Sequence, residues 1–262
     1  MRGKWLLAFV ALLAVSGLLW TPYDPLAQDF RELRLGGFSV AHPLGVDGLG
    51  RDLLSRLWRG LGNTATLSLA ALALNFIVAG AMLAVEESTG RLGKLVVPLL
   101  TAVWLGLPVI FLSLILLVFL PPGAGTLVLA VALGNAPLSY RQMRISWREQ
   151  QRAAYVEASR SIGAAGWPLF CRTLWPNLAP DIGALARLVF ALSALELSGL
   201  AFLGLIGDPD FPELGAMLRQ YQAYLNPAPW LALLPGIVLS ALLLIVHLSG
   251  NRRRGDAFSN EP

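Results

Sequence analysis

Long apolar runs, separated by short polar segments, dominate this chain. A helix crosses the hydrocarbon core of a bilayer with about 20 apolar residues, and one of the runs is divided in two by Pro121-Pro122-Gly123. The pattern therefore predicts an all-α integral membrane protein with six transmembrane helices. They lie within 5–20, 61–85, 95–140 (two helices), 181–207 and 229–249.

Composition supports this class. The chain has 262 residues, of which 56% are hydrophobic and 14% charged, whereas soluble domains have about a quarter charged residues. We expect a first transmembrane helix in 1–20, an outer loop in 21–60, a five-helix core in 61–249 and a tail in 250–262. The first run also resembles a signal peptide, with Arg2 and Lys4 before it, but five remaining helices would put the two ends on opposite sides.

The distribution of basic residues predicts the orientation. With the N-terminus inside, 13 Lys and Arg residues fall on the inner side and six on the outer side, and basic residues favour the cytoplasmic side. Both termini are therefore expected in the cytoplasm, and the net charge of +4 reflects topology rather than nucleic-acid binding. Cys171 is the only cysteine, so no intrachain disulfide can form.

The largest inner loop, about 141–177, has an ordered pattern. Four arginines at 141, 144, 148 and 152 share one helix face. They either interact with anionic lipid or extend the fourth transmembrane helix toward an acidic partner. Gly163 suits a helix end, Pro168 suits the first turn of a second short helix, and Pro176 limits its length. The loop is thus predicted to be a helix, a glycine corner and a helix outside the membrane.

The outer segment 42–59 combines a Gly-rich turn with a short amphipathic helix. Its apolar side would comprise Leu53, Leu54, Leu57 and Trp58, with Arg51, Asp52, Ser55, Arg56 and Arg59 largely opposite; such a helix can lie at the membrane surface. His42, Asp47 and Asp52 could in principle bind a metal. Three such residues in a Gly-rich loop more often serve as turn, cap and ion-pair residues, so we assign no metal site.

Two charges interrupt the fifth helix. A charge within the membrane costs at least about 2.5–3.5 kcal/mol, so Arg187 and Glu196 should face protein or water. Nine residues separate them, about 13.5 Å along a helix, which excludes a direct pair. Glu196 either lines a translocation path or makes an interhelical hydrogen bond; for Arg187 we favour the second interpretation. Asn75 and Asn135 are expected to join helices.

The inner loop resembles the EAA loop of ABC-importer permeases. The family pattern is E-A-A, three residues, G, nine residues, I-x-L-P. Glu157, Ala158, Gly163 and Pro176 match in register, whereas Ser159, Thr173 and Trp175 depart from it. The resemblance implies a coupling helix, seated in a cleft of an ATP-binding subunit. Its coupling residues would be Tyr155, Glu157, Ala158, Ser159, Gly163 and Pro176.

Two further matches narrow the family. The segment from His42 to Leu57 resembles the block that follows the first helix in dipeptide, oligopeptide and nickel permeases. Residues 196–205 and 212–218 resemble two of that family's outer motifs, with Ala201, Ile206 and Leu214 as departures. The resemblance implies a type I importer fold in the bacterial inner membrane. It also implies as partners a second permease subunit, two ATP-binding subunits and a substrate-binding protein that docks near 36–60 and 206–228.

The motifs that are absent limit the function. The chain has no G-x-x-x-x-G-K-[ST] sequence, so ATP and Mg are expected in the partner subunits, and we expect neither a cofactor nor catalysis in this chain. Few His and Met residues favour peptide import over the alternative of nickel or a metal chelate. A stand-alone secondary transporter would show repeats and midplane charges, and a membrane enzyme would show a His, Asp or Ser constellation.

Overall fold

The computed structural model describes residues 11–12 and 15–249 of the chain. Within these residues the structure is helical, with only one isolated bridge, between Val46 and Asp52. Most of the first predicted transmembrane helix and the tail 250–262 lie outside the described residues, so the structure does not test them.

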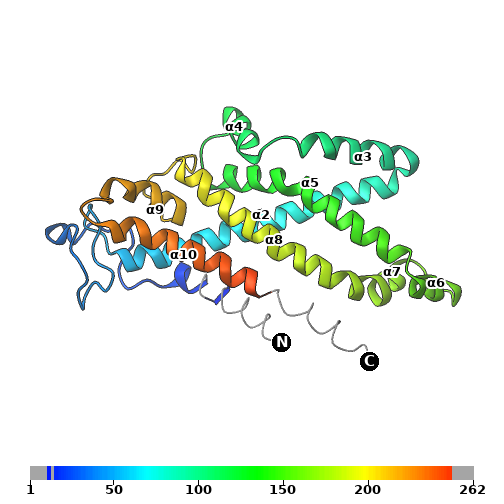
Figure 1. Cartoon of the computed structure of the whole chain (residues 1–262), viewed down its shortest axis with the longest axis horizontal. Helices are drawn as coiled ribbons and strands as arrows, with labels where there is room; N and C mark the ends of the chain where they lie inside the picture. Colours follow the sequence, from blue (N-terminus) through cyan, green and yellow to red (C-terminus); the bar gives the residue numbers. More distant parts are fainter. Residues whose placement is uncertain (1–10, 13–14, 250–262) are drawn as a thin grey trace, which may run out of the picture.

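Three long helices form the centre of the molecule. They are α2 (Leu53–Ser88), α5 (Ala124–Gln151) and α8 (Trp175–Phe202), and each packs against the other two. Figure 1 shows them side by side along the long axis, with α10 (Pro229–Leu248) beside them. The contact between α2 and α5 includes small apolar side chains, which let the two helices approach closely. Those completely buried include Ala71 on α2 and Ala130, Val131 and Ala132 on α5. This bundle is the scaffold that holds every candidate site described below.

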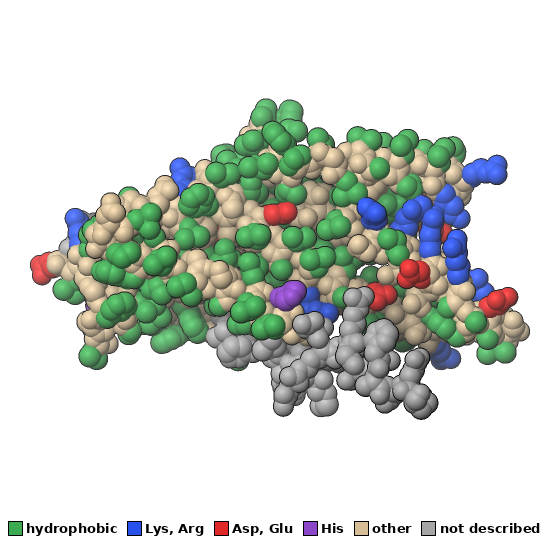
Figure 2. Space-filling model, in the orientation of Figure 1, with side chains coloured by type: hydrophobic (Ala, Val, Ile, Leu, Met, Phe, Trp, Pro, Cys, Tyr) green, Lys and Arg blue, Asp and Glu red, His purple; other side chains and the backbone are tan. Residues whose placement is uncertain are grey.

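Short elements occupy the two ends of the bundle. At one end lie α9 (Leu214–Tyr221), a 3-10 turn (Gln222–Tyr224) and the irregular segment before α2; at the other lie α6 (Ala154–Ser161) and α7 (Gly166–Leu169). We call these the α9 end and the α6 end. Figure 2 shows Lys and Arg side chains gathered at the α6 end, whereas hydrophobic side chains dominate the middle of the molecule.

Among the described residues, three helices are long and apolar enough to cross a membrane. They are α2, the continuous helix Gly166–Phe202 and α10. The fourth predicted crossing corresponds to α5, whose 28 residues include Arg141, Arg144 and Arg148 in the second half. The structure thus supports an apolar helical bundle, and six crossings remain a prediction.

The third predicted crossing is not one straight helix. It is divided into α3 (Gly90–Trp104) and α4 (Val109–Phe119), whose axes differ by 92°. Pro108 disfavours helical conformation in the residue before it, and Gly106 adds flexibility to the break. Hydropathy could not show this break, because the connector Leu105-Gly106-Leu107-Pro108 contains no charge. The pair can make one broken crossing.

The predicted short amphipathic helix is also different in the structure. Residues 53–59 form the first turns of α2, which continues without a break to Ser88. The helix begins at Leu53 because Asp52 caps it: the Asp52 side chain accepts a hydrogen bond from the Ser55 backbone N–H at 2.8 Å. Arg56 is completely buried, so this segment is not a surface helix with an exposed polar side.

Candidate functional site

The helix α6 presents most of the predicted coupling residues on its surface. Tyr155, Glu157 and Ala158 are exposed, and Ser159 is half-buried. Val156 is the buried residue of this helix, and it packs in an apolar cluster with Leu169, Leu174 and Leu178. The Val156 face of α6 is therefore packed against the start of α8, while Glu157, about 100° around the helix, is exposed and can contact another molecule.

Gly163 ends α6 as the sequence predicts. Its φ of +90° lies in the left-handed region, where a Cβ is unfavourable. The Gly163 N–H donates to the Arg160 carbonyl at 2.9 Å, and the Ala164 N–H donates to the Ser159 carbonyl at 3.0 Å. These two bonds form a Schellman motif, which fixes the direction in which the chain leaves the helix.

The second helix of the loop does not end at Pro176. From Gly166 to Phe202 the chain is one helix, with a π-helical segment at Phe170–Leu174 just before Pro176. Proline has no N–H to donate, and its ring crowds the preceding turn of the helix. In this chain that preceding turn is the wider π turn, in which the Trp175 N–H donates to the Phe170 carbonyl. The expected limit at Pro176 is thus wrong, and Pro176 lies exposed in the first turn of α8.

Two of the four aligned arginines bind a carboxylate of the same chain. Arg144 Nε lies 2.8 Å from Glu86 Oε1, and an Nη atom of Arg148 lies 2.7 Å from the same oxygen. Tyr140 donates to Glu86 Oε2 at 2.5 Å. The two alternatives for this stripe, contact with anionic lipid or with an acidic partner, therefore remain open for Arg141 and Arg152, which are exposed, and Arg148 is still partly exposed.

Glu196 makes an interhelical hydrogen bond. Its Oε2 accepts from Asn135 Nδ2 on α5 at 2.5 Å, and its side chain is half-buried. Arg187 lies about two and a half turns away, on the opposite side of α8. Asn75 likewise joins helices, since it donates to the Ala132 carbonyl at 3.0 Å and accepts from Ser139 at 2.5 Å. The predicted role of both asparagines is confirmed.

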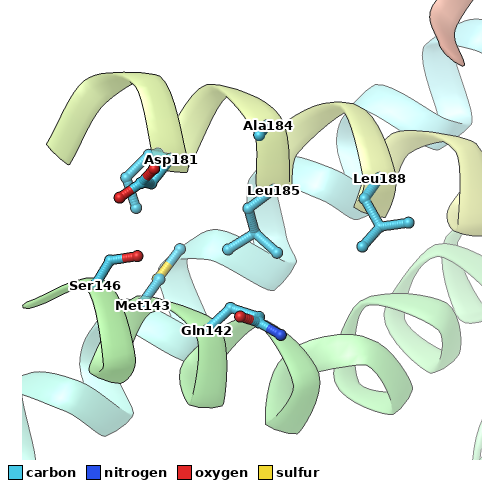
Figure 3. A pocket seen from close by; sticks show the side chains of 8 residues that line it. Gln142, Met143, Ser146, Asp181, Ala184, Leu185 and Leu188 are labelled. Atoms are coloured by element: carbon cyan, nitrogen blue, oxygen red, sulfur yellow. The ribbon is translucent and has the colours of Figure 1, made fainter. Parts of the chain in front are cut away.

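A cavity of about 330 Å³ lies between α5 and α8 on the side toward the α6 end. Figure 3 shows side chains of the two helices facing each other across it, with Ser146 and Gln142 on α5 and Asp181 on α8. Asn135 lies seven residues before Gln142, which places the two on nearly the same face of α5. The Asn135–Glu196 pair and this cavity therefore share one seam between the helices.

At the α9 end, the outer segment forms a buried ionic network. Asp47 accepts from the Leu49 and Arg51 backbone N–H groups, and its Oδ2 lies 2.7 Å from Arg51 Nε. Tyr221 donates to the same Oδ2 at 3.1 Å. Burial raises the pKa of Tyr221, so its hydroxyl keeps the proton that it donates.

The three residues weighed as metal ligands have other partners. Asp52 caps α2 and also lies 2.9 Å from His42 Nδ1, while Asp47 forms the turn and the ion pair described above. The prediction of turn, cap and ion-pair roles is confirmed. Arg51 extends the network to Asp210 at 2.7 Å, so this segment is joined to the loop before α9.

Glu213 ties α9 to two long helices. Its side chain is buried and accepts from Thr64 at 2.9 Å, from Ser198 at 2.5 Å and from the Ala216 backbone N–H at 2.9 Å. Gly215 lies directly against α8, because a Cβ added there would lie 1.9 Å from the Ser198 carbonyl oxygen. The outer motif at 212–218 thus serves as a packing joint between α2, α8 and α9.

Comparison with known proteins decides the family. The model of the family described as "Binding-protein-dependent transport system inner membrane component" matches residues 76–252. The chain belongs to this family. The match includes α5, the loop with α6 and the whole of α8 and α9, whereas the outer segment with His42, Asp47 and Asp52 precedes it.

Individual relatives give the same result. The permease is 32% identical over 258 residues to the di/tripeptide transport system permease protein DppC of Pseudomonas aeruginosa. The aligned region covers 95% of this chain and 83% of that relative. It is 30% identical over 258 residues to the glutathione transport system permease protein GsiD of an Escherichia coli strain, with 94% and 82% covered.

A solved structure shares the fold. A chain from the inward-facing MetNI methionine ABC transporter superposes with a TM-score of 0.63 at 18% identity, and the match covers 75% of the permease and 93% of that chain. Membership of a binding-protein-dependent transport family argues against a stand-alone secondary transporter and against a membrane enzyme. The predicted family is confirmed.

The sequence did not predict the structural roles of two buried carboxylates. Glu86 and Glu213 are both buried and each accepts several hydrogen bonds. The only sequence signal for Glu86 is a carboxylate that directly follows an apolar run. For Glu213 it is a carboxylate one residue before Leu214-Gly215, where α9 starts.

Proposed function

We propose that this chain is the permease subunit of a peptide ABC importer and that α6 is its coupling helix. The observation that carries the proposal is a short helix of family-like sequence, fastened on its Val156 side and exposed at Glu157. In this proposal a cleft of an ATP-binding subunit receives the exposed face. ATP and Mg bind in that subunit, and closure of two such subunits moves the helices of two permease chains.

Peptide cargo is supported by the relatives, which are named for di/tripeptides, dipeptides and glutathione. A substrate-binding protein would deliver the cargo at the α9 end, where Phe38 and Val40 are exposed. The excess of basic residues toward the α6 end favours a cytoplasmic location for that end and for both termini. The seam with Glu196, Asn135 and the cavity beside Asp181 is then a candidate wall of the translocation path.

The coupling role can be tested with a charge reversal. We expect Glu157→Lys to insert normally and to lower binding-protein-stimulated uptake by at least about tenfold, within the range of energetic coupling between sites. The measurement is peptide uptake and ATP hydrolysis in proteoliposomes that contain the whole importer. Glu149→Lys is the matched control, because it makes the same charge change at an exposed position of α5. Full coupling in Glu157→Lys would overturn the assignment.

The effect of the Glu196 charge on transport can be tested separately from the hydrogen bond of Glu196 with Asn135. Glu196→Gln keeps an acceptor for Asn135 but removes the charge. If the charge guides a peptide, uptake should fall by about an order of magnitude, which corresponds to about 1.4 kcal/mol. Asn135→Ala, which removes the bond and keeps the charge, should retain more uptake. Equal uptake by Glu196→Gln and the unmodified importer would leave Glu196 as an interhelical contact only.

A further inference from the structure

Glu86 occupies an unusual position in the permease. It lies two residues before the end of α2, and its side chain has no exposed surface. Three side chains donate to its two oxygens: Tyr140 at 2.5 Å, Arg144 at 2.8 and 3.0 Å, and Arg148 at 2.7 Å. A buried carboxylate is costly unless it is paired and hydrogen-bonded, and here both requirements are met. We call this group the Glu86 clasp.

All donors of the clasp come from α5. Tyr140, Arg144 and Arg148 are spaced by four residues, so they project from one face toward α2. Tyr140 is buried as completely as Glu86, whereas the Arg144 and Arg148 side chains are 24% and 36% exposed. The clasp is thus anchored inside the bundle and reaches outward to the surface of the α6 end.

The same stretch of α5 is joined to α6 in two ways. Only Arg152 and Ala153 separate the end of α5 from the start of α6. In addition, Trp147, which lies between the two clasp arginines, packs on the apolar cluster that holds Val156 of α6. A displacement of α6 therefore moves the arginines of the clasp with it, because covalent and packing connections are both short.

On the other side of the clasp, α2 reaches the far end of the molecule. Its 36 residues correspond to a length of about 54 Å. The helix begins directly after its cap, Asp52, and its first turn contains the buried Arg56. Arg56 donates to Gln220 of α9 at 3.0 Å, and Thr64 of α2 donates to Glu213. A force on Glu86 thus acts on one continuous helix whose opposite end is bonded to α9.

We propose that Glu86 is a positioning residue for transport: through the clasp it passes the movement of α6 into α2 and on to the α9 end. This inference rests on the proposed coupling function of α6. In this proposal the clasp couples ATP-driven closure at the α6 end to docking of the binding protein at the α9 end. Linkage of this kind is reciprocal, so loss of the clasp impairs the signal in both directions.

The test uses the whole importer in proteoliposomes, with dialanine as the probe and the binding protein preloaded with it. We expect Glu86→Gln to lower the ratio of binding-protein-stimulated to basal ATP hydrolysis by about tenfold, and dialanine uptake by a similar factor, at an unchanged amount of assembled complex. Glu87→Gln is the matched control, because it is the adjacent carboxylate and is not part of the clasp. It should leave the ratio unchanged.

A second pair of variants keeps the proposal testable if Glu86→Gln assembles poorly. Arg148→Gln removes the most exposed donor and leaves Arg144 to pair with Glu86; it should lower the stimulation ratio, whereas Arg141→Gln, on an exposed residue of the same helix, should not. The Glu86→Gln, Arg148→Gln double variant should be no worse than Glu86→Gln alone, because both changes break one link.

Two results would overturn the proposal. One is an unchanged stimulation ratio in an assembled Glu86→Gln or Arg148→Gln importer. The other is a parallel loss of assembled complex and of both ATPase rates, with their ratio intact, which a purely structural ion pair predicts. If Glu157→Lys uncouples the importer and Glu86→Gln does not, only the proposed role of the clasp is wrong. If Glu157→Lys also has no effect, the coupling role of α6 fails first.

Discussion

Replacing Asp47 with alanine is expected to lower the stability of the permease by about 3–5 kcal/mol, the usual cost of removing one partner from a buried ion pair. Asp47 and Arg51 are both buried, and the Arg51 guanidinium would lose its 2.7 Å contact with Asp47 and keep only the one with Asp210, which is largely exposed. Tyr221 would lose its acceptor as well. Thermal unfolding of the purified permease in detergent, followed by loss of the monodisperse peak, measures the effect.

Asp24→Ala provides the matched control for this prediction. Asp24 also accepts a hydrogen bond from the backbone N–H two residues later, at 2.9 Å, but it is exposed. The control therefore removes the same kind of turn bond without leaving a buried charge, and it should change stability by less than about 1 kcal/mol. Equal destabilisation by the two variants would show that the turn, and not the buried ion pair, matters.

Gly215→Ala is the second substitution with a large expected effect. A Cβ at this position would lie 1.9 Å from the Ser198 carbonyl oxygen and 2.5 Å from its carbon. Because both contacts are with the backbone of α8, α9 must move away, which also strains the bonds of Glu213 to Thr64 and Ser198. We expect a loss of about 3 kcal/mol or more, at the upper end of overpacking effects, measured by the same thermal unfolding.

Gly199→Ala is the control for the glycine substitution. Gly199 lies one residue from Ser198 within α8, and a Cβ there would meet nothing within 4 Å. Alanine is favoured over glycine in a helix by up to about 1 kcal/mol, so this variant should be as stable as the parent or slightly more so. A Gly215→Ala protein with the parent's unfolding temperature would show that α9 is free to shift.

The sequence predicted those features that arise from local chemistry. Apolar runs located α2, α8 and α10, because lipid and buried helices both need apolar side chains over about 20 residues. Gly163 was identified as a helix end because a left-handed residue there favours glycine, and the structure shows that conformation. The turn and cap roles of Asp47 and Asp52 followed from their short side chains beside glycines and a helix start.

Other features depended on partners far away in the chain and could not be read from it. Glu86 contacts residues more than fifty positions later, so its burial depends on how α2 and α5 cross. The sequence suggested an exposed polar face for Arg56, yet the structure buries it because Gln220 and the Pro25 carbonyl lie within reach. The bend between α3 and α4 was hidden because an apolar connector has the same hydropathy as a helix.

That bend has a consequence for how the permease can sit in lipid. Backbone amides without a partner are costly in hydrocarbon, where no water can replace the missing bond. In the four-residue connector, Leu105, Gly106 and Leu107 each donate their N–H to a carbonyl of α3, at 2.9–3.1 Å. The fourth residue is Pro108, which has no N–H, and its carbonyl accepts from Phe111 at 3.0 Å. The bend itself therefore adds no unpaired amide hydrogen, and the N–H groups that lipid would leave without a partner are those of Val109 and Ile110 in the first turn of α4.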